Sequence, residues 1–257
     1  MEGILTSTNN AWKGNIRAVL FDLDGTLRHS QPTFMQAFLQ IAGSLQVDLS
    51  PENSRQASRW LHYYWAQSRE LLADWPTYLE QPQHFWANHA RLLLLAMGCG
   101  EAESTSLSTG IAGRMQDSFK PEDQVLPDVP STLMHLKSAG YRLGVVSNRR
   151  KPYDEQLAAL GLQEYFELWL YAGDLERWKP NPEMFAIALQ QLDLPAQAVV
   201  YVGDNYFADV LGAQGAGLWP ILLDVDNLFP EAGCPVIPRM GDLPALLQEY
   251  IEQPNSQ

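Results

Sequence analysis

Short apolar runs, each followed by polar residues, recur along the chain and predict its β-strands. They cover residues 18–21, 143–146, 168–171, 199–202 and 221–223. From residue 128 onward, the segments between these runs place apolar residues three and four positions apart, which is the spacing of an amphipathic helix. These segments are residues 128–139, 152–160 and 182–192. Strands that alternate with helices predict an α/β fold, built on a Rossmann-like, doubly wound parallel sheet.

Residues 30–121 interrupt this alternation and carry almost no strand pattern. Three apolar faces at helical spacing lie there, at residues 34–45, 57–72 and 85–97, and Gly98 marks the end of the third. The sequence therefore predicts two domains. One is an α/β core made of residues 13–29 and 122–257, and the other is an inserted all-helical cap domain at residues 30–121.

The composition argues against several classes of protein. The 257 residues are 46% hydrophobic and 18% charged, as in a globular protein, and no apolar run approaches the ~18 residues of a membrane-spanning helix. The net charge of −13 argues against nucleic acid and anionic membranes as partners, because phosphate groups bind basic surfaces. The two cysteines lack metal-site spacing and no secretory signal is evident, so we expect a cytoplasmic protein. The sequence makes no prediction of oligomeric state.

Polar side chains of the kinds used in catalysis and ligand binding follow three of the predicted strands. They are Asp22, Asp24 and Thr26 after the first strand, Ser147 and Asn148 after the second, and Asp204 and Asp209 after the fourth, with Lys179 just before the helix at 182–192. In an open parallel sheet, ligands bind at the carboxyl ends of the strands. We therefore expect these residues to converge on one edge of the sheet.

The combination of these side chains favours a phosphate site beside a metal ion. Several carboxylates in one crevice repel one another, so we expect a cation to compensate them. Oxygen ligands alone favour a hard ion, and Mg²⁺ is the best match. A hydroxyl, an amide and a lysine suit a bound oxyanion. A carboxylate that attacks phosphorus makes covalent aspartyl-phosphate chemistry available.

Four ordered motifs carry a resemblance to a known family. They are Asp22-Leu23-Asp24-Gly25-Thr26, Val146-Ser147-Asn148, Lys179-Pro180 and Gly203-Asp204-Asn205-Tyr206-Phe207-Ala208-Asp209. Together they resemble the haloacid dehalogenase-like (HAD) superfamily, in its phosphatase-type branch with a helical cap after the first motif. The resemblance covers the whole predicted core and the position of the cap.

The resemblance implies the catalytic and metal-binding roles. Asp22 is the nucleophile, and Asp24 is the general acid for the leaving alkoxide and then the base for the hydrolytic water. Mg²⁺ is bound by a carboxylate oxygen of Asp22, the main-chain carbonyl of Asp24 and the carboxylate of Asp204. The dehalogenases of the superfamily lack an acid at the position of Asp24, so its presence favours phosphate esters.

The remaining motif residues are expected to bind phosphate or to support the site. Ser147, Lys179 and main-chain N–H groups, including that of Asn148, hold the transferring phosphoryl group. Lys179 also offsets the charge of the nucleophile. Asp209 orients Lys179 or a metal-bound water, and Thr26 supports the first motif.

The expected activity is hydrolysis of the phosphate monoester of a small phosphorylated metabolite. One alternative is a phosphomutase of the same superfamily, and another is a non-catalytic phosphate-binding or protein-binding module on a HAD core. A phosphonate-cleaving relative would need a lysine in the cap, and residues 30–119 contain none.

A basic run, Arg149, Arg150 and Lys151, stands out in this acidic chain. Our hypothesis is that one of these residues contacts a second anionic group of the substrate or the edge of the cap. The alternative is a solvated loop. Arg28 and His29, at the expected hinge, are further candidates for the same contact.

Aromatic residues and histidines of the insert are assigned mainly to structure. The aromatic residues Trp60, Tyr63, Tyr64, Trp65, Trp75 and Trp86 are expected to form mostly the core of the cap, with a substrate platform as the alternative. For His62, His84 and His89 we expect solvated or capping positions.

Overall fold

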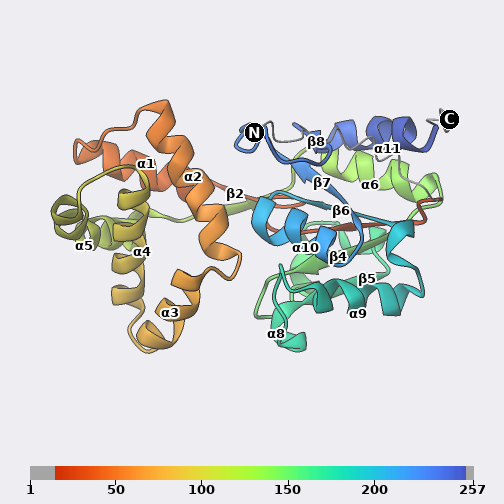
Figure 1. Ribbon diagram of the computed structural model, residues 1–257, viewed down its shortest axis with the longest axis horizontal. Coiled ribbons are helices and arrows are strands. Elements are labelled where there is room, and N and C mark those ends of the chain that lie inside the picture. The colour runs from red at the N-terminus through yellow and green to blue at the C-terminus, as the bar shows by residue number, and fades with distance from the viewer. Residues whose placement is uncertain (1–14, 253–257) are drawn as a thin grey trace, which may run out of the picture.

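A six-stranded parallel sheet forms the centre of the α/β part of the protein, in a computed structural model that describes residues 15–252 (Figure 1). The strand order is β5-β4-β1-β6-β7-β8. The strands are β1 Ala18–Phe21, β4 Arg142–Ser147, β5 Leu168–Tyr171, β6 Val199–Gly203, β7 Trp219–Leu223 and β8 Val236–Ile237. The five predicted strands are confirmed within a few residues at their ends, and the Rossmann-like fold class is confirmed with them.

Both faces of the sheet are buried, which explains why its strands read as apolar runs. Val19 and Phe21 of β1 point into one core, while Ala18 and Leu20 point into the other. Three helices cover the first face: α6 Asp128–Ser138, α7 Asp154–Ala159 and α11 Leu243–Glu252. Three others cover the second face: α8 Ala172–Leu175, α9 Pro182–Leu192 and α10 Leu211–Gly215 (Figure 1). Short 3₁₀ turns lie at Gln163–Tyr165, Ala196–Ala198 and Met240–Asp242, and a π-turn at Tyr206–Val210.

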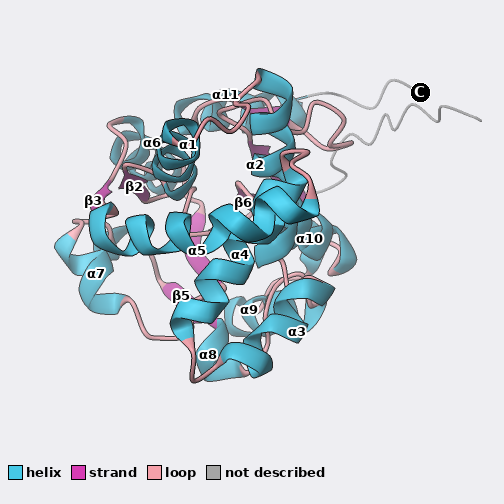
Figure 2. Ribbon diagram, turned by 90° about the vertical axis from the view of Figure 1, so that its left-hand side faces the viewer, coloured by secondary structure: helices cyan, strands magenta, loops and turns pink. Residues whose placement is uncertain are grey.

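Five helices form a separate cluster beside the sheet, seen in front of it in Figure 2. They are α1 Phe34–Ser44, α2 Pro51–Trp65, α3 Arg69–Tyr78, α4 Pro82–Ala96 and α5 Glu101–Ser118. The chain enters and leaves this cluster through an antiparallel ribbon of β2 His29–Gln31 and β3 Glu122–Gln124. The predicted helical cap is thus present. Its domain boundaries next to residues 30 and 121 fall in the ribbon and stay a prediction, and residues 13 and 14 lie outside the described part.

Three local predictions were wrong or incomplete. The apolar face at 57–72 is two helices, because Gln67 between them adopts a left-handed conformation (φ 59°) and Ser68 caps the next helix by accepting a hydrogen bond from the Leu71 N–H at 3.1 Å. The helix expected to start at Pro152 begins at Asp154. The helix α5 and the β2–β3 ribbon were not predicted, since both are rich in polar residues and the ribbon takes its register from pairing between distant segments. Among the described residues, no helix is long and apolar enough to cross a membrane.

His89 lies in the aromatic core of the cap, only 1% exposed. The rings of Tyr64, Phe34 and Trp60 surround it at centroid distances of 4.7, 5.5 and 5.6 Å. Its Nε2 has no hydrogen-bond partner among the described residues. Burial lowers the pKa of His89 to about 3, so the ring is neutral in the folded protein. The expectation of a solvated or capping histidine was wrong here, whereas His84 is exposed and contacts Gln81 near the start of α4.

We expect His89 to make the stability of the protein depend on pH. The unfolded chain binds a proton at His89 below its ordinary pKa of 6.5, whereas the folded chain does not do so until about pH 3. Stability is therefore complete above pH 6.5 and falls as the pH drops through this window, by about 2 kcal/mol at pH 5. Urea unfolding at pH 7 and pH 5 measures this loss. In His89→Phe the difference between the two pH values should shrink by that amount; an unchanged difference would contradict the assignment.

Candidate active site

A pocket of about 310 Å³ opens at the carboxyl ends of β1, β4 and β6. Its walls include every residue expected to do chemistry except Thr26. The lining residues are Asp22, Asp24, Leu61, His62, Trp65, Ser147, Asn148, Arg149, Lys179, Asp204, Asn205, Ala208 and Asp209. Thr26 lies just behind the wall, where its hydroxyl donates to Asp204 Oδ1 at 3.2 Å. The parallel strands have brought together motifs that are up to 187 positions apart in sequence, from Asp22 to Asp209.

The ammonium group of Lys179 occupies the floor of this pocket and is 2% exposed. Its Nζ donates to Asp22 Oδ1 and to Asp209 Oδ1, both at 2.6 Å, and to Tyr201 Oη at 2.9 Å. The side chain of Asn148 holds the main chain of Lys179, because its Oδ1 accepts from the Lys179 N–H at 2.6 Å and its Nδ2 donates to the Lys179 carbonyl at 2.9 Å. The amide of Asn148 is thus engaged, and only its main-chain N–H is left for phosphate.

Burial and crowding shift the pKa values of the acidic groups upward. Burial raises the pKa of Asp22 to about 7, with Asp209 and Asp24 adding to the rise and Lys179 opposing it. The pKa of Asp204 is raised well above its ordinary value by burial and by the charges of Asp22 and Asp209. Burial lowers the pKa of Lys179, but Asp209 and Asp22 outweigh that effect and hold it above its ordinary value. The carboxylates therefore need more positive charge than Lys179 provides.

The carboxylates are arranged as a binding site for a hard cation. One oxygen each from Asp22, Asp204 and Asp209 lie within 4.8 Å of one another. Asp209 is already engaged by protein donors, since Oδ1 accepts from Lys179 and Oδ2 accepts from the Asn205 N–H at 2.9 Å. Asp22 and Asp204 are consequently the better ligands, and an oxygen-only set fits Mg²⁺. Gly25, at φ +91°, makes room for Asp204, because a Cβ there would lie 2.3 Å from Asp204 Oδ2.

The carboxylate of Asp24 points away from this cluster and into two guanidinium groups. Its Oδ1 accepts from Arg28 Nη1 at 2.6 Å and from Arg149 Nη2 at 2.7 Å, and its Oδ2 accepts from Arg149 Nε at 2.6 Å. As a metal ligand Asp24 is assigned only through its main-chain carbonyl, and that assignment stays a prediction. Arg149 lines the pocket, so the basic run does reach the site.

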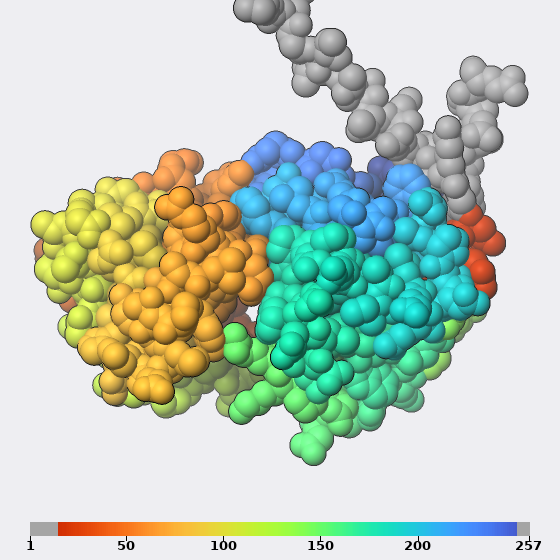
Figure 3. All heavy atoms as spheres, turned by 60° about the horizontal axis from the view of Figure 1, so that its bottom comes forward, coloured from red at the N-terminus to blue at the C-terminus, as the bar shows by residue number. Residues whose placement is uncertain are grey.

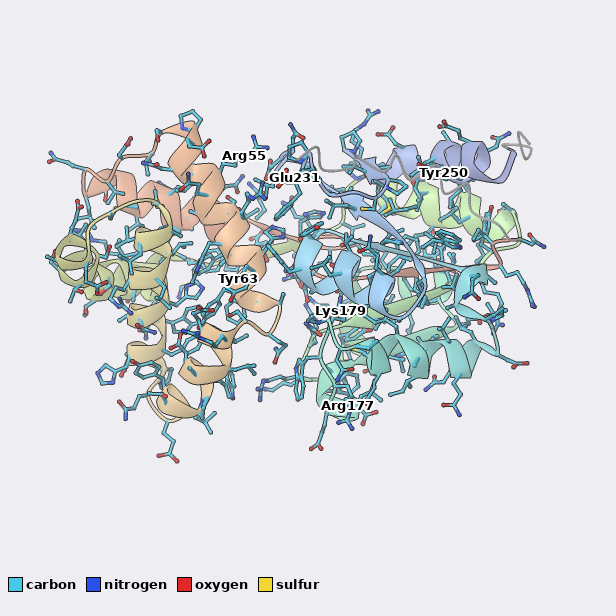
Figure 4. All side chains as sticks on the ribbon, in the orientation of Figure 1. Arg55, Tyr63, Arg177, Lys179, Glu231 and Tyr250 are labelled. Carbon is cyan, nitrogen blue, oxygen red and sulfur yellow. The ribbon has the colours of Figure 1, made fainter. Side chains whose placement is uncertain are left out.

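The helix α2 of the cap forms the roof of the pocket. The Arg59 Nη1 donates to the Leu228 carbonyl of the core at 3.0 Å, and its guanidinium lies 4.8 Å from the centre of the Phe229 ring. Asn205 Nδ2 donates to the His62 carbonyl at 2.9 Å. Arg55 of α2 and Glu231 of the core lie near each other at the upper end of this contact, and Lys179 lies lower, within the core (Figure 4). In Figure 3 the surfaces of the α2–α3 region and the core abut.

The aromatic residues of the cap divide between packing and the interface. Tyr64 is fully buried, and Trp60 packs against it at 4.9 Å between ring centroids, as expected for a cap core. Trp65 packs against Tyr64 and His89 at 5.2 and 5.6 Å between ring centroids, but it is also 36% exposed and lines the pocket. The ring of Tyr63 contacts that of Phe207 in the core, at 5.6 Å between centroids. The guanidinium carbon of Arg150 lies 3.9 Å from the centre of the Trp75 ring. His62 also lines the pocket, and burial lowers its pKa.

Tyr201 is the functional residue that sequence reasoning missed. It sits in β6, fully buried, where its hydroxyl accepts from Lys179 Nζ and donates to the Val146 carbonyl at 2.8 Å. Burial raises the pKa of Tyr201 well above its ordinary value, so it stays protonated. The available signal was a single hydroxyl within an otherwise apolar strand, because a buried tyrosine O–H needs a polar partner.

Comparison with known proteins identifies the family. The family model of the haloacid dehalogenase-like hydrolases matches residues 16–217. The chain is 29% identical to a glyceraldehyde 3-phosphate phosphatase of Methanopyrus kandleri, over 79% of this chain and 82% of that protein. It is 30% identical to a ribulose-1,5-bisphosphate 5-phosphatase of Halopiger xanaduensis, over 80% of this chain and 84% of that protein.

A solved structure agrees with this result. The 2-haloacid dehalogenase of Pseudomonas syringae pv. Tomato is 26% identical and superposes with a TM-score of 0.51, covering 91% of this chain and 99% of that one. The family match spans most of the chain, including all four motifs and the helical insert between the first and second. The protein belongs to the haloacid dehalogenase-like hydrolases.

Proposed function

We propose that the protein is a Mg²⁺-dependent phosphatase that hydrolyses the phosphate monoester of a small metabolite through an aspartyl-phosphate on Asp22. The observation that carries the proposal is the buried contact of Lys179 with Asp22 at 2.6 Å, on the floor of a pocket that also holds Asp204, Ser147 and Asn148. The two phosphatase relatives support the same chemistry.

The first half of the reaction needs a fixed carboxylate. Lys179 holds Asp22 through Oδ1, which leaves Oδ2 to attack phosphorus. As the new P–O bond forms, the ester P–O bond breaks, and the leaving alkoxide takes a proton from Asp24. The Ser147 hydroxyl and the N–H of Asn148 hold the phosphoryl oxygens. Bound Mg²⁺ supplies the positive charge that keeps Asp22 and Asp204 ionised beside an anionic substrate.

The second half regenerates the enzyme. A water attacks the phosphorus of the phosphoaspartate, and Asp24 takes a proton from that water. The P–O bond to Asp22 breaks, so Asp22 is a free carboxylate again and inorganic phosphate leaves. Asp24 has to move away from its arginine partners to reach the leaving alkoxide in the first half and the attacking water in the second. Its side chain is 38% exposed, so space for this movement exists.

Dehalogenation is the competing reaction within the family, because one structural relative is named a 2-haloacid dehalogenase. Displacing a halide requires no acid for the leaving group, whereas expelling an alkoxide does. Asp24 lines the pocket next to Asp22 and supplies such an acid. A binding-only module would not need the nucleophile, lysine and acid together, so phosphate-ester hydrolysis remains the better proposal.

We expect turnover of p-nitrophenyl phosphate to require both Mg²⁺ and Asp22. EDTA should abolish it and added Mg²⁺ should restore it, because the carboxylate cluster is left uncompensated without the ion. Asp22→Asn should lower kcat by at least about 10³-fold, since the amide is a poor nucleophile. Asp117→Asn, which changes an exposed aspartate of α5, is the matched control and should behave as wild type. Equal rates for wild type and Asp22→Asn would remove the nucleophile assignment.

Tyr201→Phe tests the support of Lys179. The loss of one acceptor for Nζ and of the donor to Val146 should lower the free energy of unfolding by about 1–2 kcal/mol. It should also lower kcat, by roughly tenfold, because Lys179 is held less firmly against Asp22. Tyr64→Phe removes a buried hydroxyl that donates to Asp74 at 2.9 Å within the cap, and this control should affect stability alone. If both variants keep full kcat, Tyr201 is a structural residue only.

A further inference from the structure

We propose that Arg149 selects substrates with a second anionic group, a carboxylate or a second phosphate, by exchanging its contact with Asp24 for a contact with that group. The inference rests on the proposed phosphatase function and names the substrate class of the same site. It also couples substrate recognition to the release of the catalytic acid.

The first observation is that both oxygens of Asp24 are engaged. Arg149 contacts both oxygens through Nε and Nη2, and Arg28 contacts Oδ1 through Nη1, all at 2.6–2.7 Å. A carboxylate held in this way cannot serve a leaving group in the pocket. Asp24 therefore has to give up its contact with at least one arginine before it can protonate the leaving group, and another anion has to take its place beside that arginine.

The two arginines differ in what remains when Asp24 leaves. Arg28 keeps a carboxylate partner, since its Nη2 and Nε donate to Asp123 Oδ1 at 2.6 and 3.0 Å. Arg149 keeps no carboxylate at ion-pair distance among the described residues: its remaining contacts are the side-chain amide of Gln156 and the ring of Tyr153, whose centre is 5.8 Å from the guanidinium carbon, and Asp123 and Asp22 act on it only at longer range. Its side chain is 24% exposed. A largely buried guanidinium without a counter-charge is costly, so Arg149 is the one that needs a new anion.

The charges of the pocket leave no other place for a second anion. Lys179 is committed to Asp22 and Asp209 on the floor. Among the described residues that line the pocket, Arg149 is the one other lysine or arginine. Arg150, the next residue, is exposed, and its guanidinium carbon lies 3.9 Å from the ring centre of Trp75 in the cap and 5.7 Å from that of Trp178. The basic run thus places one arginine in the site and one at the edge of the cap.

The chemistry of the guanidinium group fits this exchange. Its planar fork pairs with a carboxylate or a phosphate through two parallel N–H bonds, as it already does with Asp24. A substrate with a second anion takes that place, and Asp24 becomes free to reach the ester oxygen. A substrate without one leaves Asp24 bound. The selection should therefore act on kcat as well as on KM.

Two pairs of esters, each of which differs in a second anionic group, test the proposal on the wild-type enzyme with Mg²⁺. One pair is the phosphate ester of glycolate and that of its neutral amide. The other is propanediol bisphosphate and propanediol monophosphate. We expect kcat/KM to be about 10- to 100-fold higher for the charged member of at least one pair. The pair that shows the preference identifies the second anion as a carboxylate or a phosphate.

Substitution of Arg149 assigns the preference to this residue. In Arg149→Ala the ratio of charged to neutral kcat/KM should fall to near one, and Arg149→Lys should recover part of it. Arg239→Ala removes an exposed charge that pairs with Asp242 and should keep the wild-type ratio. Equal rates for both members of both pairs in the wild type would overturn the proposal. So would an Arg149→Ala variant that slows charged and neutral esters equally.

A binding measurement keeps the proposal testable if Arg149→Ala does not fold. Without Mg²⁺, calorimetry of Asp24→Asn should show tighter binding than wild type, and the gain should be larger for the charged ester than for the neutral one. The same gain for both esters would contradict the exchange. Failure of the proposed function looks different, because then wild type would not hydrolyse even p-nitrophenyl phosphate, and the inference would fall with it.

Discussion

The buried ammonium of Lys179 is the interaction on which the site depends. Burying a charge is costly unless it is paired and hydrogen-bonded, and Lys179 meets both conditions with Asp22, Asp209 and the Tyr201 hydroxyl. Its main chain is fixed by Asn148 at the end of β4. One side chain thus joins segments that follow three neighbouring strands. Removing any one partner leaves a buried polar or charged group short of a contact, so the floor of the site has little freedom to rearrange.

The rim of the site is built in the opposite way. Asp24 is partly exposed, and its arginine contacts are an exchangeable network next to solvent. The difference matches the proposed chemistry, in which a nucleophile has to be held in line with phosphorus while an acid has to move between partners. The roof, α2, is fixed to the core by Arg59 and by the carbonyl of His62. The pocket is therefore bounded by a fixed floor at Lys179, by the exchangeable contacts of Asp24 at its rim and by α2 as its roof.

The sequence predicted those parts of the molecule that depend on local pattern. Buried parallel strands read as apolar runs, and the rule that ligands bind at their carboxyl ends is enough to place Asp22, Ser147 and Asp204 at one edge of the sheet. What failed depends on distant partners. The hydroxyl of Tyr201 acquires its role only through Lys179, and the antiparallel ribbon only through pairing of residues about 90 positions apart. The neutral His89 could not be told from a solvated histidine without the aromatic rings that α1, α2 and α4 place around it, because a single histidine in the sequence carries no pattern.

The charge of the protein gives the local cations their importance. With a net charge of −13, the long-range field repels an anionic substrate, although salt screens that field beyond about 10 Å. Affinity has to arise inside the pocket, where Lys179 is already neutralised by two carboxylates. In the proposed mechanism, two sources of positive charge are then left for the substrate: a divalent ion at Asp22 and Asp204, and the guanidinium of Arg149. The first attracts any phosphate, so discrimination between phosphorylated molecules falls to the second and to the cap above it.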